Sequence, residues 1–112
     1  DLEVEFIDLN SKLLRIINQM RPFGPKNMHP VFVTHNCKDT GASRIVGKDK
    51  THLRLDVLDS NRTHFQGIGF GLGHMLKKVK ETETFSILYT LDENYYNGKA
   101  NLQLKLRDIK FN

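Results

Sequence analysis

The residues best suited to chemistry in this chain are five histidines and one cysteine, and they are scattered along the sequence. They are His29, His35, Cys37, His52, His64 and His74. No two histidines have the HxH or HxxxH spacing of metal ligands, and Cys37 has no partner for a multi-cysteine site or an internal disulfide. The acidic pair Asp92-Glu93 is expected to be a solvated loop end. The sequence therefore predicts neither a catalytic site nor a metal site in these 112 residues.

A glycine-rich segment, residues 67–73, has the sequence GIGFGLG. It lacks the GxGxxG spacing of dinucleotide-binding loops and the lysine-serine pair of P-loops, so it does not predict a nucleotide site. Glycines at alternate positions of a strand have two roles to offer. They relieve the curvature of the sheet, or they let another backbone approach closely. Of these two interpretations, curvature is favoured.

The charged residues give a more specific signal. The chain has 17 Lys and Arg against 13 Asp and Glu, a net charge of +4, and residues 44–54 hold four Lys and Arg and one acid. Cations neutralise phosphates and release counterions, while aromatic rings give nucleobases a surface for stacking. These residue types favour a nucleic-acid interface, whose candidate residues are Arg44, Lys48, Lys50, His52, Arg54, Tyr95, Tyr96 and Lys99. A solvated basic face is the alternative.

The spacing of apolar residues changes along the chain from helical to alternating. A helical stripe runs from Leu9 to Met20, with Asp8 or Asn10 as the N-cap, after an extended lead-in over residues 1–7. All three prolines then fall within residues 21–32, which predicts a rigid elbow. Alternation and β-branched residues predict strands at 31–35 (resuming at 44–46 after a loop or bulge), 52–57, 63–70, 85–91 and 101–109. A short helix is expected at 71–80, and a loop at 92–98 that contains an Asn-Gly turn.

Two of these strands have clear faces. Leu53, Leu55 and Val57 are predicted to point inward and His52, Arg54 and Asp56 outward. In the last strand Leu102, Leu104 and Leu106 are predicted to point inward and Gln103, Lys105 and Arg107 outward.

Five strands with a helix between the third and the fourth is the element order of the OB-fold. The predicted fold class is therefore mainly β, a five-stranded OB-fold Greek-key barrel with a short helix between strands 3 and 4, preceded by an N-terminal helix. The expected division is residues 1–21 for that helix and 22–112 for the OB-fold domain. OB-folds bind oligonucleotides on strands 2 and 3 and on the loops between strands 1–2 and 4–5. The candidate interface residues lie at these places.

The composition also bears on cellular setting. No apolar run approaches the length of a membrane span and no signal peptide is visible, so no membrane partner is expected. A single cysteine fits a cytoplasmic location. The first residue is Asp1, so the chain is expected to be part of a longer protein.

Four stretches of the sequence resemble, in order and spacing, the OB domain of RecJ, a single-stranded-DNA-specific exonuclease of the DHH phosphoesterase superfamily. The first is Pro22-Phe23-Gly24-Pro25-Lys26-Asn27 with Pro30-Val31-Phe32, which is similar to the family's PFGPGN-PEPVF. The others are residues 47–55, similar to GKDGKHLRL, residues 68–71, similar to AIAFG, and residues 94–109, similar to NEWNG…LQL…DI. The resemblance covers about residues 6–110. It departs from the family at Lys26, at Met28-His29 and at Tyr96, where glycine, a Pro-Glu type pair and tryptophan are usual.

The resemblance implies a role within a larger enzyme. The parent would degrade single-stranded DNA from 5′ to 3′ in repair and recombination, using Mn²⁺ or Mg²⁺ held by its DHH domain. This fragment, with no cofactor of its own, would be the non-catalytic OB domain that grips the strand. Residues 1–21 would be the connector helix from the catalytic DHH/DHHA1 domains. The alternative is a bracing or protein-interaction module that docks an acidic partner, such as the tail of a single-strand-binding protein.

Overall fold

The computed structural model describes residues 2–10, 12, 13, 15, 19 and 30–112. Lys12, Leu13, Arg15 and Gln19 have helical backbone. The Leu13 amide donates a hydrogen bond of 2.7 Å to Asn10 Oδ1, which is the interaction of an N-cap. Most of the Pro-rich elbow lies outside the described residues, and so do several positions of the predicted helix. The expected division at residue 21 therefore stays a prediction.

The described residues form one sheet of seven strands, not five. The strands are β1 Leu2–Glu3, β2 Phe32–Asp39, β3 Arg44–Val46, β4 His52–Leu58, β5 His64–Gly69, β6 Phe85–Tyr96 and β7 Lys99–Phe111. The short helices are η1 Phe6–Asp8, η2 Gly73–Met75 and α2 Leu76–Glu81. The count exceeds the prediction because the lead-in contributes β1, and because β2 and β3 are separate strands. The mainly β class and the helix after β5 are confirmed.

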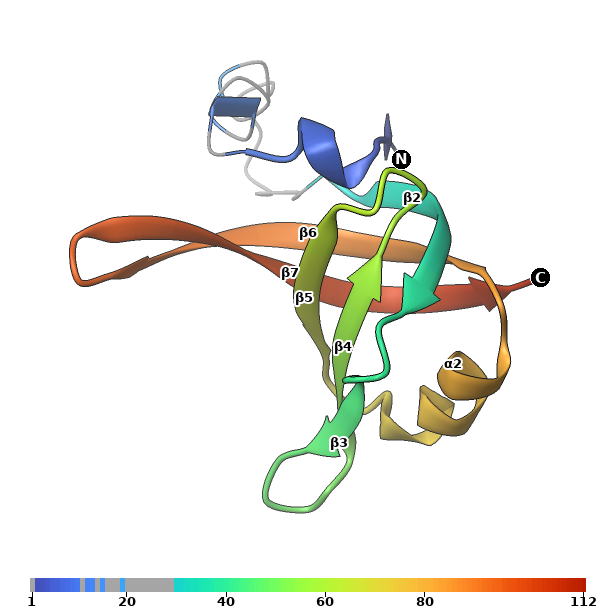
Figure 1. The fold of residues 1–112 in the computed structure, drawn as a ribbon. Helices are drawn as coiled ribbons and strands as arrows, with labels where there is room; N and C mark the ends of the chain where they lie inside the picture. Colours follow the sequence, from blue (N-terminus) through green and yellow to red (C-terminus); the bar gives the residue numbers. More distant parts are fainter. Residues whose placement is uncertain (1, 11, 14, 16–18, 20–29) are drawn as a thin grey trace.

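The sheet order is β1-β2-β6-β7-β5-β4-β3, with an additional pairing between β2 and β4 (Figure 1). That pairing joins Lys38 to Leu58 and Asp39 to Val57. It follows a register shift in β2 between Thr34 and Cys37, where Asn36 has a φ of 59°. A bulge bends its strand, so the start of β2 can pair with β6 and its end with β4. The predicted irregularity after residue 35 is thus a bulge, beyond which the strand continues to Asp39.

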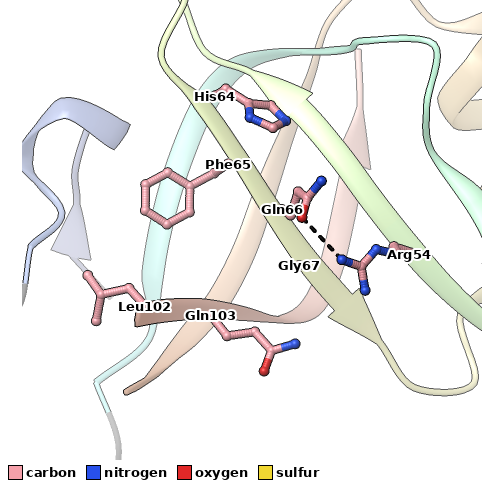
Figure 2. Close-up of a pocket in the computed structure, with 7 residues that line it drawn as sticks. All are labelled: Arg54, His64, Phe65, Gln66, Gly67, Leu102 and Gln103. Carbon is pink, nitrogen blue, oxygen red and sulfur yellow. Dashed lines mark hydrogen bonds between the residues drawn. The ribbon is translucent and has the colours of Figure 1, made fainter. Parts of the chain in front are cut away.

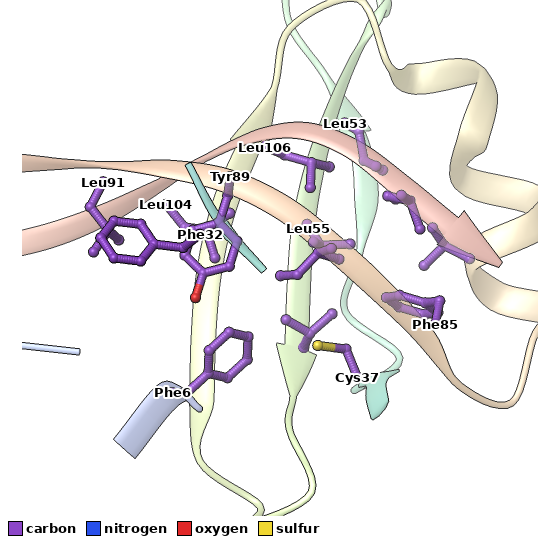
Figure 3. Packing of buried hydrophobic residues seen from close by; sticks show 14 of the residues in the cluster. Phe6, Phe32, Cys37, Leu53, Leu55, Phe85, Tyr89, Leu91, Leu104 and Leu106 are labelled. Atoms are coloured by element: carbon purple, nitrogen blue, oxygen red, sulfur yellow. The ribbon is translucent and has the colours of Figure 1, made fainter. Parts of the chain in front are cut away.

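The core lies on the inner face of this sheet (Figure 3). Its buried apolar residues are Phe6, Leu9, Phe32, Cys37, Leu53, Leu55, Val57, Val79, Phe85, Ile87, Tyr89, Leu91, Leu104, Leu106 and Ile109. The inward positions predicted for β4 are confirmed, and in β7 Leu102 is half-buried against the core. Phe6 and Leu9, which precede the elbow, belong to the same core.

The segment predicted as a loop over residues 92–98 is instead the end of a long hairpin. β6 continues to Tyr96, which pairs with Lys99, and only Asn97 and Gly98 form the turn. Their φ angles are 51° and 76°, and a two-residue hairpin turn of this kind requires positive φ at both positions. Asp, Glu and Asn are depleted in strands, which explains the wrong prediction, but pairing along β7 outweighs that preference. Figure 1 shows this hairpin extending beyond the other strands.

Gly67 lies where β5 meets β7. A Cβ placed there would be 2.7 Å from the carbonyl oxygen of Leu104 and 2.5 Å from its Cδ2 atom. The close approach of two backbones therefore accounts for this glycine, rather than the curvature favoured from the sequence.

Candidate nucleic-acid interface

A row of side chains crosses four strands on the outer face of the sheet. Arg44 of β3 pairs with Arg54 of β4, Arg54 pairs with Ile68 of β5, and Ile68 pairs with Lys105 of β7. Residues that pair across neighbouring strands project from the same face and have side chains close enough to interact. We call Arg44, Arg54, Ile68 and Lys105 the basic row. Three cations thus line one face, of which the sequence identified Arg44 and Arg54 as site residues.

A shallow pocket of about 320 Å³ adjoins the basic row at Arg54 (Figure 2). Its lining residues are Arg54, His64, Phe65, Gln66, Gly67, Leu102 and Gln103. Arg54 Nη2 donates a hydrogen bond of 3.1 Å to Gln66 Oε1, which holds the guanidinium against β5. The pocket therefore offers hydrogen-bonding groups beside a fixed cation.

Asp56 lies on the outer face as predicted, but it is buried rather than solvated, with 8% of its surface exposed. Its carboxylate accepts hydrogen bonds of 2.7 Å from Thr40 Oγ1 and 2.8 Å from Gln66 Nε2, and it contacts His64 Nε2 at 2.6 Å. Burial acts to raise the pKa of Asp56, but these three partners outweigh it and the net pKa is lowered. Alternation in the sequence assigns a face to Asp56 but cannot show that neighbours cover it.

The lowered pKa of Asp56 predicts a loss of stability in acid. A carboxylate whose pKa is lower in the folded state stabilises that state above its unfolded pKa, about 3.9, and this stabilisation is lost as pH falls through the folded pKa. We expect Asp56→Asn to be less stable than wild type at pH 7, and this difference to shrink at pH 3. Urea unfolding at both pH values measures it, with Asp49→Asn in an exposed turn as the control. A difference that is constant with pH would contradict the prediction.

Lys48 and Lys50 are exposed in the turn between β3 and β4, next to the basic row. The Lys50 amide donates a hydrogen bond of 3.1 Å to the carbonyl oxygen of Gly47, which closes the turn. The His52 ring packs against this turn, because a Cβ on Gly47 would lie 2.6 Å from the ring. The half-buried His52 thus supports the turn that carries the two lysines.

The other candidate residues lie on the β6–β7 hairpin, away from this turn (Figure 1). Tyr95 is 73% exposed and its hydroxyl donates a hydrogen bond of 2.7 Å to Glu93, which raises the pKa of Tyr95. Lys99 is exposed, and Tyr96 pairs with it in the strand, although the Tyr96 side chain is outside the described part. The structure therefore brings together Arg44, Lys48, Lys50, His52 and Arg54, and separates them from Tyr95, Tyr96 and Lys99.

Sequence reasoning did not include Lys105, Arg107 and Phe70 in the site. Alternation along β7 placed Lys105 and Arg107 outward, and that was the available signal. What places them beside β5 is the parallel pairing of β5 with β7, through Gly67 with Leu104 and Ile68 with Lys105. Such a pairing joins strands far apart in the sequence, which no local pattern reveals.

Cys37 and His35 have structural roles. Cys37 is fully buried, and burial raises its thiol pKa to about 12, with a further contribution from the charge of Asp59. His35 contacts Ser86 Oγ at 2.6 Å through Nδ1 and Glu3 Oε1 at 2.8 Å through Nε2. The series of contacts from Ser86 through His35 to Glu3 resembles a hydrolytic triad. Because Ser86 is buried, however, the three side chains serve to connect β6, β2 and β1. No cluster of three or more His, Cys, Asp or Glu side chains suited to a metal ion occurs among the described residues.

The element order, with a helix between β5 and β6, is that of an OB-type domain, and its outer face carries cations on β3, β4 and β7. A family model described as the RecJ OB domain matches residues 1–108. The chain belongs to the RecJ OB domain family, which confirms the resemblance of its four motifs. A search of curated proteins found no match. In the described part of the chain no helix is both long and apolar enough to span a membrane.

Proposed function

We propose that this domain binds single-stranded DNA on the outer face of β3, β4, β5 and β7, as part of a RecJ-like 5′→3′ exonuclease that acts in DNA repair and recombination. The observation that carries the proposal is the basic row, which places Arg44, Arg54 and Lys105 on one face of an OB domain. Family membership supports it. The pairings among β2, β4, β5, β6 and β7, which return from β4 to β2, support their assignment as the five strands of the OB barrel.

The cations of this face are available to phosphates. Among the described residues, no carboxylate lies within ion-pair distance of Arg44, Lys48, Lys50 or Arg54. Lys105 differs, because its Nζ atom lies 3.2 Å from Asp92 Oδ2. The four cations without a carboxylate partner therefore supply most of the counterion release that drives binding.

Hydrolysis belongs, in this proposal, to the catalytic DHH domain of the parent chain, with Mn²⁺ or Mg²⁺ as its metal. The domain described here grips the strand, and residues 1–21 connect it to the DHH/DHHA1 domains. Tyr95, Tyr96 and Lys99 form a second contact on the β6–β7 hairpin. The location expected for such a protein is the cytoplasm.

Removing the four unpaired cations is the test of this interface. We expect the variant Arg44→Ala/Lys48→Ala/Lys50→Ala/Arg54→Ala to bind a labelled single-stranded oligonucleotide with a slope of log K against log salt reduced by roughly 3, about 0.7 for each phosphate contact. Fluorescence anisotropy at several salt concentrations measures this slope.

The matched control removes four exposed lysines from other elements, Lys38, Lys77, Lys78 and Lys110. It loses the same charge but should retain most of the slope. If both variants lose the slope equally, binding depends on net charge and not on this face. If neither loses it, the interface is elsewhere.

An acidic peptide is the second candidate ligand, and one observation favours it. β3 is the last strand of the sheet order, and an edge strand offers unpaired backbone groups to which an extended peptide can add. Ile45 of β3 is exposed, and Arg44 beside it would attract acidic side chains. A peptide like the tail of a single-strand-binding protein that displaces DNA in competition would share the basic face. One that binds without displacing DNA would occupy a separate site.

A further inference from the structure

Phe70 is an exposed aromatic ring that the packing of the domain does not explain. It follows directly after β5, and 62% of its surface is exposed. Phe6, Phe32 and Phe85, by contrast, lie in the core. Proteins that bind single strands combine positively charged grooves with aromatic side chains on which bases stack, and Phe70 is an aromatic ring of that kind beside a charged surface.

The ring of Phe70 is held in place rather than free. The Phe70 ring and the His52 ring meet in a T-shaped arrangement, with a centroid distance of 5.2 Å and an interplanar angle of 78°. The next amide, that of Gly71, donates a hydrogen bond of 3.0 Å to Nδ1 of His52. Gly71 has a φ of 73°, which favours glycine and fixes the chain direction after Phe70. A ring ordered in advance loses little conformational entropy when a ligand stacks on it.

Phe70 also borders a second shallow pocket, of about 390 Å³, whose lining includes two basic side chains. Leu72 and Leu106 are its apolar lining, and Thr90, Asp92, Lys105 and Arg107 are its polar lining. Asp92 is engaged by Lys105 at 3.2 Å, whereas no carboxylate lies within ion-pair distance of Arg107 in the described part of the chain. The lining of one pocket therefore includes both an exposed aromatic ring and an unpaired guanidinium.

We propose that Phe70 and Arg107 form a subsite for one unpaired nucleotide, with its base stacked on the Phe70 ring and its phosphate on Arg107. The subsite rests on the proposed function and extends it, because Lys105 links the pocket to the basic row. An unpaired base can reach the ring, whereas a base within a duplex is already stacked on its neighbours. The subsite thus supplies a physical reason for preferring single strands.

The chain contains no tryptophan, so Phe70→Trp introduces a single tryptophan at the subsite, which can be excited selectively over the tyrosines. We expect its emission to be quenched when a single-stranded oligonucleotide binds, and to be quenched much less by an abasic oligonucleotide of equal length. Ile7→Trp, which places the fluorophore at an exposed position of η1, is the control and should show little change with either ligand. Equal quenching by the normal and abasic strands would overturn base stacking at Phe70.

Affinity gives the second measurement. Phe70→Ala is expected to weaken oligonucleotide binding about 5- to 150-fold, the usual range for one stacked base, while leaving the salt slope and the affinity for the abasic strand unchanged. Phe70→Tyr should restore most of the affinity, because it retains the ring. Salt-dependent binding that is insensitive to Phe70→Ala would overturn the subsite and leave the proposed function intact. Failure of the wild type to bind any single strand would overturn both.

Discussion

Replacing Phe6 by alanine is expected to destabilise the domain by about 3–5 kcal/mol, the usual cost of removing a buried phenylalanine side chain. Phe6 is 1% exposed and lies in the core with Tyr89 (Figure 3). Its ring centroid lies 5.2 Å from that of Phe65 and 6.3 Å from that of Tyr89. Truncation would leave a cavity lined by two aromatic rings that belong to β5 and β6. Ile68 of β5 belongs to the basic row on the outer face of the sheet. A loss of packing on the inner face of β5 should therefore also disturb the candidate interface.

The neighbouring residue gives a matched control for this prediction. Ile7 is 65% exposed on the same turn of η1, so Ile7→Ala should change the free energy of unfolding by less than about 0.5 kcal/mol. Urea unfolding followed by circular dichroism measures both variants. If Phe6→Ala changed the free energy of unfolding as little as Ile7→Ala, residues 2–9 would pack only loosely on the sheet and the core would end at β2.

Much of the sheet was predictable because its information is local. The alternation of Leu53, Leu55 and Val57 fixes the inner face of β4, since successive side chains of a strand project to opposite faces. The Asn97-Gly98 turn was predictable for a similar reason, because few other residue pairs accept positive φ at both positions. In each case a few consecutive residues contain the signal, and the remainder of the fold agrees with it.

The contacts that complete the core and the site depend on residues far apart in the sequence. Phe6 lies within the lead-in that was predicted to be extended over residues 1–7, yet residues 6–8 form η1 instead. Its amide donates a hydrogen bond to Asp59 and its ring contacts Phe65, which places Phe6 in the core. Lys105 joins the basic row only through the parallel pairing of β5 with β7. Local patterns therefore identified the segment that carries Arg44 and Arg54, but they could not reveal which other strand lies beside it.

Asp59 joins a local turn to a segment far away in the sequence, so replacing it tests how much the distant contact contributes to stability. It is buried, and its carboxylate accepts hydrogen bonds from the backbone amides of Phe6 at 2.7 Å, Asn61 at 3.0 Å and Thr63 at 3.1 Å. We expect Asp59→Asn to cost about 2–3 kcal/mol, because the new amide group would face the Phe6 amide with a donor and leave it unpaired. Asp49→Asn, in the exposed β3–β4 turn, should cost much less. Urea unfolding at pH 7 measures both.

A double-mutant cycle tests whether Asp59 and Phe6 act as one unit. Phe6→Leu keeps an apolar side chain and should leave a folded protein, so it can be combined with Asp59→Asn. Residues in direct contact show interaction energies of about 0.5–3 kcal/mol, whereas independent sites are additive within about 0.5 kcal/mol. We expect the double variant to be less destabilised than the sum of the single variants, because once Asp59 no longer holds the Phe6 amide the ring is already loosened. Strict additivity would mean that Asp59 stabilises only its own turn, and that the lead-in reaches the core by apolar packing alone.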